Sequence, residues 1–492
     1  MAQATANSMF VDTETPKKIA IIGGGLVGSL SACFLAKRGY QVDVYERRED
    51  IRRAEKVVGK SINLALSHRG RTALRAVGLE KHIVAEGIPM RARMIHSLDE
   101  TTHPVPYGTR EDHFIISIDR RRLNEVMLTL AESQPNVTLH FGHKLVRCNL
   151  HTGRMLFQLS DNINERVEKF ADSIIGCDGA HSAVRDAMLK QAGFQYQQEY
   201  IEHGYIELVT PPTKNGEYAM PPNYLHIWPR MTFMLIALPN LDKSFTTTLF
   251  MPFDKFSQLR SPETVVDFFR TTFPDALNLI GEESLVKDFL GTKPSSLISV
   301  KCKPYHFGKA IIIGDAAHAM VPFYGQGMNA GFLDCLRLDE LLEEYNGNFE
   351  RVYPEFTRRM QINSHAIIDL AMYNYIEMRY LVNTRSFLIR KKVDNFLYRL
   401  FPNTWIPLYT MVTFSLLPYS ECMKRKKWQD TVLRRGVRIG IAMVVLLAYY
   451  RFGPRPPVRM YINAFKSAVK DWFYELRVRR FELNRNELIG MP

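Results

Sequence analysis

The sequence lacks the paired cysteines and the apolar leader that are typical of secreted proteins. Its 492 residues include six cysteines, at positions 33, 148, 177, 302, 335 and 422, and none of them form a CxxC motif. This spacing argues against a disulfide framework or a zinc site and favours a reducing compartment. The opening segment, MAQATANSMFVDTETPKK, has no apolar core. We therefore expect no signal peptide in this segment, and we expect a flexible arm over residues 1–17.

Most of the chain also lacks an excess of charge of either sign. The net charge is +13, but residues 421–492 hold 16 Lys and Arg against 6 Asp and Glu, which leaves only +3 for the other 420 residues. We therefore expect no nucleic-acid binding by the main body. No Ser-His-Asp or metal-ligand pattern stands out, so no metal is expected. The length predicts two or three domains.

The first motif lies near the amino terminus. Residues 18–23, KIAIIG, form an apolar run typical of a buried parallel strand. Gly23, Gly25 and Gly28 follow in GxGxxG register, residues 29–39 resemble a helix, and a second strand over residues 41–46 ends in Glu46. In this context the glycines let the backbone approach a pyrophosphate, and Glu46 can accept from ribose hydroxyls. The pattern predicts a dinucleotide site, with a glycine-rich turn in another α/β unit as the alternative.

Two later motifs suggest which dinucleotide is bound. Residues 174–185, IIGCDGAHSAVR, lead from an apolar strand to Asp178, and residues 311–320, IIIGDAAHAM, lead from another to Asp315. NAD needs only the first motif, whereas a flavin has a ribityl chain that Asp315 can bind. The backbone amides of residues 325–329 would face the negative charge that develops on a reduced flavin.

These three motifs, in this order, resemble those of the aromatic-hydroxylase family of FAD monooxygenases over about residues 18–420. The resemblance implies bound FAD, transient NADPH, O₂, and ring hydroxylation through a flavin hydroperoxide. Such a site must exclude water, and we expect Pro322, Phe323 and Tyr324 to form an aromatic bend beside the flavin. No second GxGxxG is present for NADPH, so its contacts cannot be assigned.

We expect the cofactor site to combine the three motifs with residues near them. The expected cofactor-binding residues are Gly23, Gly25, Val27, Gly28, Tyr45, Glu46, Arg47, Arg48, Ala65, Arg120, Leu145, Asp178, Asp315, Gln326, Gly327, Met328 and Asn329. This chain has Lys60 where the family commonly has Arg, which replaces a fork-shaped donor with a point charge. His318 is expected to be structural because it stands at a helix start.

A strand-rich segment separates the second and third motifs. Residues 204–212, 223–230, 232–240 and 244–253 are short apolar runs between Pro, Asn and Asp turns. Four apolar residues could share one face of the resulting sheet: Leu225, Ile236, Leu238 and Phe250. They could equally be a core layer. The resemblance implies instead that they form a wall of the aromatic-ring pocket.

Polar residues elsewhere predict how an aromatic amino acid with an aniline ring would be held. By resemblance Arg93 and Tyr107 bind its carboxylate, although a lone Arg is usually a surface residue. Asn374, Glu377 and Met378 share one helix face, and Glu377 could balance the substrate ammonium.

A second uncharged segment could also contribute to the substrate site. Tyr409 lies in residues 401–420, which carry no charge and are expected to form a buried helix beside the pocket rather than a membrane span. Two alternatives remain open for the whole chain: another aromatic amino acid as substrate, or a non-catalytic flavin-binding scaffold or sensor.

The basic tail has its own pattern. Residues 439–450 are uncharged and mostly apolar, yet shorter than a standard membrane span unless flanking arginines snorkel. Apolar residues at 458, 462, 465, 469, 472 and 476 predict an amphipathic helix. We expect a membrane anchor over residues 421–492, with a partner-binding helix as the alternative. The family resemblance implies the outer mitochondrial membrane, with the catalytic body in the cytosol.

The sequence thus predicts an α/β protein with a Rossmann-like FAD-binding domain in two parts, residues 18–195 and 301–345. An antiparallel β-sheet substrate domain, residues 196–300, is inserted between them. A helical region over residues 346–420 would close the active site, and the membrane-associated tail follows. The oligomeric state is not predicted.

Overall fold

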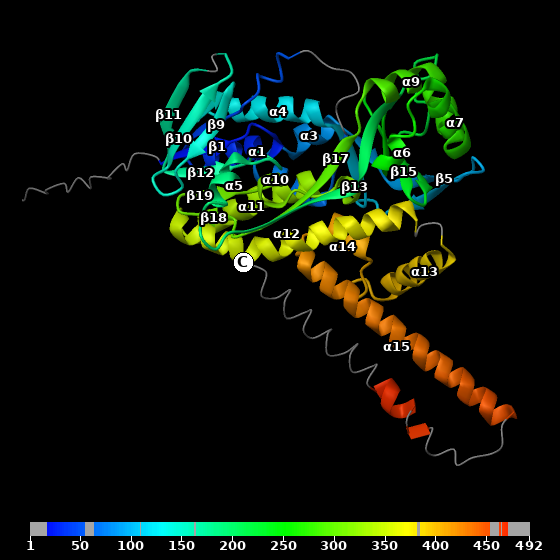
Figure 1. Cartoon of the computed structure of the whole chain (residues 1–492). Helices are drawn as coiled ribbons and strands as arrows, with labels where there is room; N and C mark the ends of the chain where they lie inside the picture. Colours follow the sequence, from blue (N-terminus) through cyan, green and yellow to red (C-terminus); the bar gives the residue numbers. More distant parts are fainter. Residues whose placement is uncertain are drawn as a thin grey trace, which may run out of the picture.

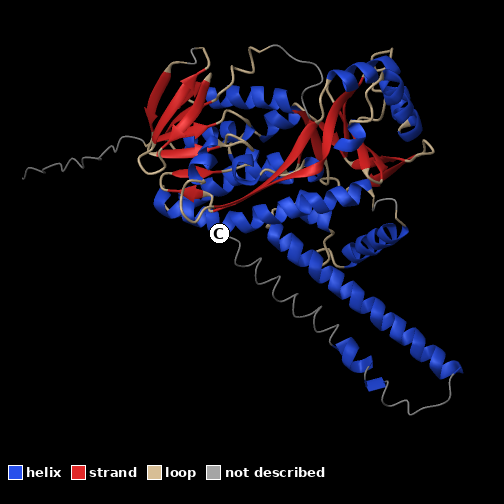
Figure 2. Cartoon of the chain, in the orientation of Figure 1, coloured by secondary structure: helices blue, strands red, loops and turns tan. Residues whose placement is uncertain are grey.

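The computed structural model describes residues 17–54, 63–108, 110–161, 164–380, 384–452, 462–463 and 465–470. The expected flexible arm, apart from its last residue, and Lys60 lie outside these ranges. Two lobes that contain sheets lie side by side, and helices of the carboxyl-terminal part pack below them (Figures 1 and 2). One long helix projects from this body.

The first lobe is built on a six-stranded sheet in which all neighbouring strands are parallel except β18 and β19. Its order is β18 (His306–Phe307), β19 (Ala310–Ile312), β12 (Ser173–Gly176), β1 (Lys18–Ile22), β2 (Gln41–Tyr45) and β8 (Val137–His140). The three strands that carry the sequence motifs, β19, β12 and β1, are therefore adjacent. Because they are parallel, their carboxyl ends meet at one edge, as a shared ligand requires.

The helices of the first lobe lie around this sheet (Figure 1). They are α1 (Leu26–Lys37), α2 (His68–Ala76), α3 (Glu80–Ala85), α4 (Arg120–Glu132), α5 (Ala183–Met188), α10 (Asp315–His318), η1 (Pro322–Tyr324) and α11 (Gly327–Glu344). The small residues of α1, including Ser29, Ser31 and Ala32, are all buried, which lets α11 pack closely against it.

Two small antiparallel sheets complete the lobe. One consists of β11 (Arg166–Phe170), β10 (Arg154–Leu159) and β9 (His143–Cys148). The other consists of β3 (Asn63–Leu66), β7 (Ile115–Asp119) and β4 (Ile88–Met90). The sequence motifs gave no indication of either sheet.

The second lobe is a seven-stranded sheet. Its order is β17 (Ser295–Lys303), β13 (Gln195–Thr210), β16 (Phe245–Pro252), β15 (Phe233–Pro239), β14 (Tyr224–Arg230), β5 (Ala92–His96) and β6 (Thr102–Pro106). The expected strands are present, but β5 and β6 come from outside residues 196–300, and β5 pairs with β14 in parallel. The structure therefore corrects the expectation of a purely antiparallel sheet confined to the insertion. The pairing sets Arg93 opposite Leu225.

Four helices cover one face of this second sheet: α6 (Phe253–Phe256), α7 (Pro262–Thr272), α8 (Pro274–Ile280) and α9 (Glu282–Gly291). Their apolar residues, among them Phe269 and Phe289, form a core with Leu235 and Leu249 of the sheet. The opposite face of the sheet is turned toward the first lobe, because Phe250 contributes to the core of that lobe.

The carboxyl-terminal part is helical, with α12 (Phe349–Arg379), α13 (Arg385–Leu400), α14 (Leu408–Phe414) and α15 (Tyr419–Phe452). The uncharged segment 401–420 does not form one helix: α14 covers seven of its residues, Pro407 stands directly before α14, and Pro418 stands directly before α15. Arg69, fully buried, donates to the carbonyls of Met411 (3.2 Å), Val412 (2.7 Å) and Leu417 (2.6 Å). It thereby fixes α14 to the first lobe.

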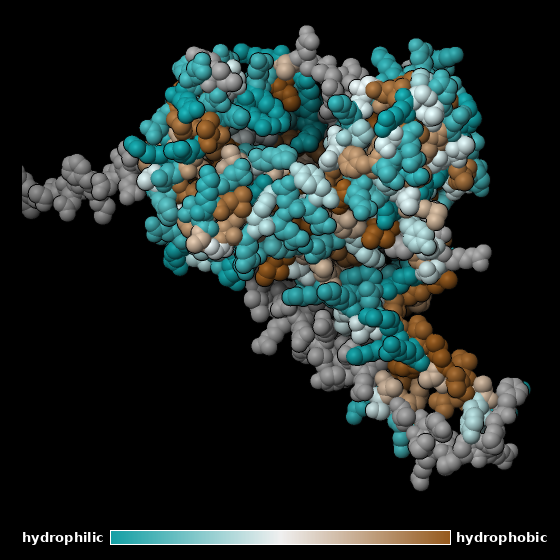
Figure 3. All heavy atoms as spheres, in the orientation of Figure 1, coloured by the Kyte–Doolittle hydropathy of each residue, from teal (hydrophilic) through white to brown (hydrophobic). Residues whose placement is uncertain are grey.

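Helix α15 begins in the body and ends outside it. Cys422, Trp428 and Val432 are buried, whereas Val437 and most of the following apolar residues are exposed (Figure 3). The expected boundary of the tail at residue 421 therefore lies about four turns too early. Among the described residues, no helix combines the length and apolar composition needed to cross a membrane. Val458, Trp472 and Leu476 of the expected amphipathic helix lie outside the described ranges.

Candidate functional site

The glycine loop after β1 forms a tight cradle at the start of α1. Gly23 has a φ of +104°, and its N–H donates to the carbonyl of Tyr45 at 2.8 Å. A Cβ on Gly28 would lie 2.0 Å from the carbonyl oxygen of Gly23, so no side chain fits there. A Cβ on Gly25 would meet nothing within 4 Å. The loop is thus tightly packed at Gly28, whereas the space beside Gly25 at the helix start is open, as phosphate binding requires.

Glu46 is fixed at the end of β2. Its Oε2 accepts from the Gly24 N–H at 2.9 Å and its Oε1 from the Arg48 N–H at 3.0 Å. The side chains of Arg47 and Arg48 are exposed. Tyr45 differs from expectation: its ring is buried between His140 (ring centroids 4.7 Å apart) and Phe157 (4.3 Å). Only the backbone of Tyr45 can face a cofactor, because its side chain is part of the core.

Two acidic residues stand at the ends of the other motif strands. Asp178 Oδ2 accepts from the Ala183 N–H at 2.7 Å, while its buried Oδ1 has no hydrogen-bond partner among the described residues. Burial raises the pKa of Asp178. Asp315 is exposed at the first residue of α10, and its Oδ1 lies 4.0 Å from where a Cβ on Gly327 would stand. An unpaired buried acceptor beside a glycine cradle suits a ligand that brings hydroxyl donors.

The turn before α11 is held by side chains that were expected to touch the cofactor. Asn329 Nδ2 donates to the carbonyls of Ala65 (2.8 Å) and Gly325 (2.7 Å), and Oδ1 accepts from the Ser67 N–H (2.8 Å). Gln326 Oε1 accepts from the Tyr419 hydroxyl at 3.1 Å. These two side chains therefore organise the turn. Contact with a cofactor is left to the backbone of this segment, which includes Gly327 and Met328.

The remaining expected cofactor residues lie around this edge in different ways. Val27 packs closely on the second turn of α11, because its Cγ2 would lie 2.5 Å from a Cβ on Gly331. Leu145 is buried on β9, opposite Phe157. Arg120 is exposed at the start of α4. Burial raises the pKa of Glu207 to about 7, and the positive charge of Arg120 opposes this rise.

The cradle, the fixed Glu46 and the unpaired Asp178 oxygen together fit FAD. Gly23 to Gly28 would bind its pyrophosphate and Glu46 its ribose. Asp178 and Asp315 stand at the ends of adjacent strands, where hydroxyl groups of the same ligand could reach them.

Arg93 is the central charge of a second, buried site. It is only 5 % exposed, and its guanidinium lies over the ring of Tyr409 at 4.6 Å. Its Nη1 is 3.5 Å from Glu377 Oε1. Burial disfavours its charge, but Tyr409, Glu377 and Tyr107 outweigh that effect and raise the pKa of Arg93. Among the described residues, Arg93 Nε and the hydroxyl of Tyr107 have no hydrogen-bond partner. Both donors are thus available to a buried anion.

Aromatic rings surround this charge. Tyr409 stacks with Tyr107 (centroids 5.3 Å apart) and with Tyr324 (5.6 Å), while Phe323 stacks with Tyr375 (3.8 Å) and lies edge-on to Phe250 (5.0 Å). Burial raises the pKa of Tyr107 and of Tyr324 far above the usual value, so both hydroxyls stay protonated. Pro322, which opens this bend, is exposed.

Helix α12 supports the aromatic bend. Asn374 Nδ2 donates to the carbonyl of Phe323 at 2.7 Å and to the sulfur of Met378 at 3.1 Å. Its amide donors are therefore used, and only its oxygen can serve a substrate. Leu225, Ile236 and Leu238 lie together with Tyr107 and Tyr409 in one apolar cluster. The structure thus brings all ten expected substrate residues to one region, although Asn374 and Met378 act there mainly on the bend.

Two features of this site carried no signal in the sequence. Lys391 of α13 is close to Arg93 and Glu377: burial and repulsion from Arg93 lower its pKa to about 8, and Glu377 opposes them. His96, on the same strand as Arg93, is buried between Asp275 (2.6 Å from Nδ1) and His226 (2.9 Å from Nε2). This chain of polar contacts fixes β5, and with it Arg93, against β14.

Sequence relatives agree with this geometry. The chain is 55 % identical to the kynurenine 3-monooxygenase of Anopheles gambiae over 85 % of its own length and 86 % of the relative's. It is 54 % identical to that of Sus scrofa over 88 % and 91 %, respectively. The chain belongs to the kynurenine 3-monooxygenase family. The FAD binding domain family matches residues 17–350, which confirms the expected cofactor.

Solved structures show the same fold as this kynurenine 3-monooxygenase family member. The tetrameric form of 2-methyl-3-hydroxypyridine-5-carboxylic acid oxygenase has a TM-score of 0.61 at 19 % identity, over 76 % of this chain and 96 % of that chain. The p-nitrophenol 4-monooxygenase PnpA from Pseudomonas putida DLL-E4 has a TM-score of 0.61 at 17 % identity, over 83 % and 99 %. The prediction of an α/β aromatic-hydroxylase fold is confirmed.

Two other observations bear on the kynurenine 3-monooxygenase site. His318 donates from Nε2 to Asp334 Oδ2 at 2.5 Å in the interior, and Gly314 N–H donates to the same oxygen at 2.9 Å. Burial disfavours the charge on His318, but Asp334 outweighs this effect and raises its pKa. His318 thus joins α10 to α11, in line with the expected structural role. No metal-ligand cluster is found among the described residues.

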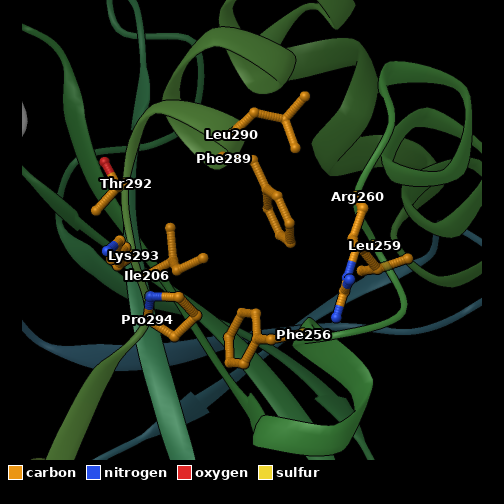
Figure 4. Close-up of a pocket in the computed structure, with 9 residues that line it drawn as sticks. All are labelled: Ile206, Phe256, Leu259, Arg260, Phe289, Leu290, Thr292, Lys293 and Pro294. Carbon is orange, nitrogen blue, oxygen red and sulfur yellow. The ribbon is translucent and has the colours of Figure 1, made fainter.

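A surface cavity of about 270 Å³ lies near α6 and α9, lined by Ile206, Phe256 and Phe289, with Arg260 and Lys293 also on its wall (Figure 4). Ile206, Phe256 and Phe289 belong to the core under the helix-covered face of the substrate sheet. The cavity is therefore on the opposite side of that sheet from Arg93. It is separate from the substrate site.

Proposed function

We propose that this protein hydroxylates L-kynurenine to 3-hydroxykynurenine with FAD, NADPH and O₂, in tryptophan catabolism. The observation that carries the proposal is the buried Arg93, with Tyr107 beside it and the FAD cradle on the adjoining lobe. Relatives named kynurenine 3-monooxygenase share 41–55 % identity with most of the chain. Site and relatives thus point to the same reaction.

The substrate's polar end matches the unpaired donors of the site. Kynurenine carries a carboxylate, an ammonium group and an aniline ring. Arg93 Nε and the Tyr107 hydroxyl would bind the carboxylate, since charge-assisted hydrogen bonds from a buried guanidinium are strong. Glu377, 3.5 Å from Arg93, would then share its negative charge with the ammonium group. The ring would lie along Leu225, Ile236 and Leu238.

The protein's own residues position the substrate and exclude water. Bound FAD would supply the redox chemistry, since it takes electrons from NADPH and activates O₂ for transfer of one oxygen atom to the ring. Phe323, Tyr324 and Tyr375 make the walls of the site apolar and dry. The aniline nitrogen already activates the neighbouring ring carbon, so no strong base is needed.

For the tail, we propose membrane contact through the exposed apolar part of α15. Val437, Ile441, Val444, Val445 and Leu447 are each more than half exposed. Arginines stand before this stretch, at positions 434 and 435, and after it, at position 451, where they could reach lipid headgroups. The family resemblance favours the outer mitochondrial membrane as the location, with the catalytic body in the cytosol. Deleting residues 437–492 should leave the core residues of α15 in place and release the protein from membranes.

The reaction is tested with purified protein, NADPH, O₂ and kynurenine, followed by identification of the product. We expect 3-hydroxykynurenine and kynurenine-stimulated oxidation of NADPH. A flavin-binding scaffold would bind FAD but show no such stimulation, and an enzyme for another aromatic amino acid would turn over that compound in preference to kynurenine. Either result would overturn the proposed substrate.

A further inference from the structure

The aromatic bend, Pro322 to Tyr324, has little regular structure of its own. It is a single turn, η1, closed by a hydrogen bond from the Gly325 N–H to the carbonyl of Pro322 at 2.8 Å. Gly325, with a φ of +64°, ends the turn. Such a short turn keeps its place only when neighbouring elements hold it. The side chains around Phe323 therefore matter for how well the site excludes water.

Helix α12 holds Phe323 at two points. Asn374 Nδ2 donates to the backbone carbonyl of Phe323 at 2.7 Å. The next residue, Tyr375, stacks on its ring: the centroids are 3.8 Å apart and the planes differ by 15°. Tyr375 is only 2 % exposed. From the second lobe, Phe250 meets the Phe323 ring edge-on at 5.0 Å. The bend is thus held between α12 and the substrate sheet.

Tyr375 is itself held by a second layer of side chains. The guanidinium of Arg379 lies over the Tyr375 ring, 4.7 Å from its centroid, and the ring of His203 meets it edge-on at 5.3 Å. His203 Nε2 is 3.3 Å from Arg379 Nη1 and 3.0 Å from the carbonyl oxygen of Thr232. His203 belongs to β13, and Thr232 lies in the turn between β14 and β15. The substrate sheet therefore fixes the layer that backs Tyr375.

We propose that Tyr375 is a positioning residue: its stacked ring, backed by Arg379 and His203, keeps Phe323 where it seals the reaction site. This inference rests on the proposed hydroxylation of kynurenine. In the coupled reaction, kynurenine, NADPH, H⁺ and O₂ give 3-hydroxykynurenine, NADP⁺ and H₂O. When water enters the site, NADPH, H⁺ and O₂ give NADP⁺ and H₂O₂ instead. Tyr375 therefore favours hydroxylation over the loss of electrons to hydrogen peroxide.

The test uses the full-length, FAD-loaded protein with NADPH, O₂ and kynurenine, and measures the ratio of hydrogen peroxide to 3-hydroxykynurenine. In Tyr375→Leu this ratio should rise about threefold or more, since a stacked aromatic pair favours the closed bend by a factor of that order. Tyr375→Phe should keep the parent ratio, because the Tyr375 hydroxyl has no hydrogen-bond partner among the described residues. Arg379→Met removes the cation over the ring and should raise the ratio about twofold.

A second measurement does not depend on turnover. Iodide quenching of the fluorescence of the bound flavin reports how open the site is to solvent. The quenching constant should rise in Tyr375→Leu and stay at the parent value in Tyr375→Phe; no rise in Tyr375→Leu would contradict the sealing role. The matched control is Tyr373→Leu, because Tyr373 is 38 % exposed and lies about 200° around α12 from Tyr375. Both measurements should be unchanged in this control.

The outcomes separate this inference from the proposed function. If the parent protein forms no 3-hydroxykynurenine, the proposed function fails, and the role of Tyr375 fails with it. If the parent forms the product and Tyr375→Leu keeps the parent ratio, only the role of Tyr375 is refuted. A rise of the kynurenine Kd by about tenfold or more in Tyr375→Leu would make Tyr375 a substrate contact and overturn the assignment. If Tyr375→Leu loses its flavin, Arg379→Met decides, and a parent-like ratio in that variant overturns the inference.

Discussion

Replacing Arg93 with Ala should remove most of the affinity for kynurenine and leave FAD bound. Arg93 is 5 % exposed and its Nε has no partner among the described residues, so a bound carboxylate would be held in a place that water reaches poorly. A hydrogen bond to a charged group contributes about 1.5–3 kcal/mol. We take about 3 kcal/mol for this buried contact, which corresponds to a roughly 150-fold higher Kd. FAD should be unaffected because its glycine cradle follows β1, on the other lobe.

The assay is a kynurenine titration followed by the change in flavin absorbance, with the flavin content measured on the same samples. Arg91→Ala is the matched control: Arg91 precedes the same strand but is exposed and donates to the carbonyl of Glu111 at 2.9 Å. It should bind kynurenine normally. A Kd for Arg93→Ala within threefold of the parent value would refute the carboxylate assignment, and loss of flavin would show that Arg93 supports the fold instead.

Three further substitutions test the cofactor lobe and the sheet. Gly28→Ala should leave less than about a tenth of the flavin content, because its Cβ would meet the carbonyl of Gly23, whereas Gly440→Ala enters open space and should retain it. Asp334→Asn should cost about 3 kcal/mol in urea unfolding, since it leaves a buried His318 without its counter-charge. Glu207→Gln should raise stability at pH 8 by roughly 2 kcal/mol, allowing for partial exposure.

The sign of the Glu207 effect follows from its raised pKa. Between the unfolded value of 4.5 and about 7, the unfolded chain loses its proton while the folded protein keeps it, so stability falls as pH rises through this window. Below about pH 4.5 the Gln variant should show no advantage in thermal unfolding. An equal gain at both ends of the range would mean that burial of the carboxylate is not the cause.

The other two predictions have their own refuting results. A normal flavin content in Gly28→Ala would contradict the steric argument for the glycine cradle. A loss of unfolding free energy below about 1 kcal/mol in Asp334→Asn would contradict the role of Asp334 as counter-charge to His318.

The local elements of the cofactor lobe could be read from the sequence because each is encoded by neighbouring residues. The apolar runs before Gly23, Asp178 and Asp315 became β1, β12 and β19, and the shared edge followed from their parallel order. The side chains were harder to place. Tyr45 and Asn329 were assigned to the cofactor. In the structure, the ring of Tyr45 is in the core and the side-chain amide of Asn329 holds a turn. Spacing along a strand or helix does not show which groups the tertiary fold will supply.

The substrate site shows the same limit at longer range. Arg93 and Leu225 are opposite each other only because β5 joins β14 in parallel, across more than a hundred residues of sequence. The polar chain from His96 to Asp275 and the position of Lys391 likewise depend on pairings that no local pattern encodes. The uncharged length of residues 401–420 suggested one helix, but its prolines limit α14 to seven residues.

Helix α15 runs without a proline or a break from Tyr419 to Phe452, so its buried and exposed parts form a single rigid rod. About 16 residues extend past the body, roughly 24 Å at 1.5 Å per residue. Whatever surface holds the far end of this rod also sets the tilt of the whole catalytic body. Inserting a flexible glycine segment after residue 436 would uncouple the orientation of the catalytic body from that of the exposed part of α15. The activity of this variant would show whether the enzyme needs a fixed orientation or only attachment to the surface.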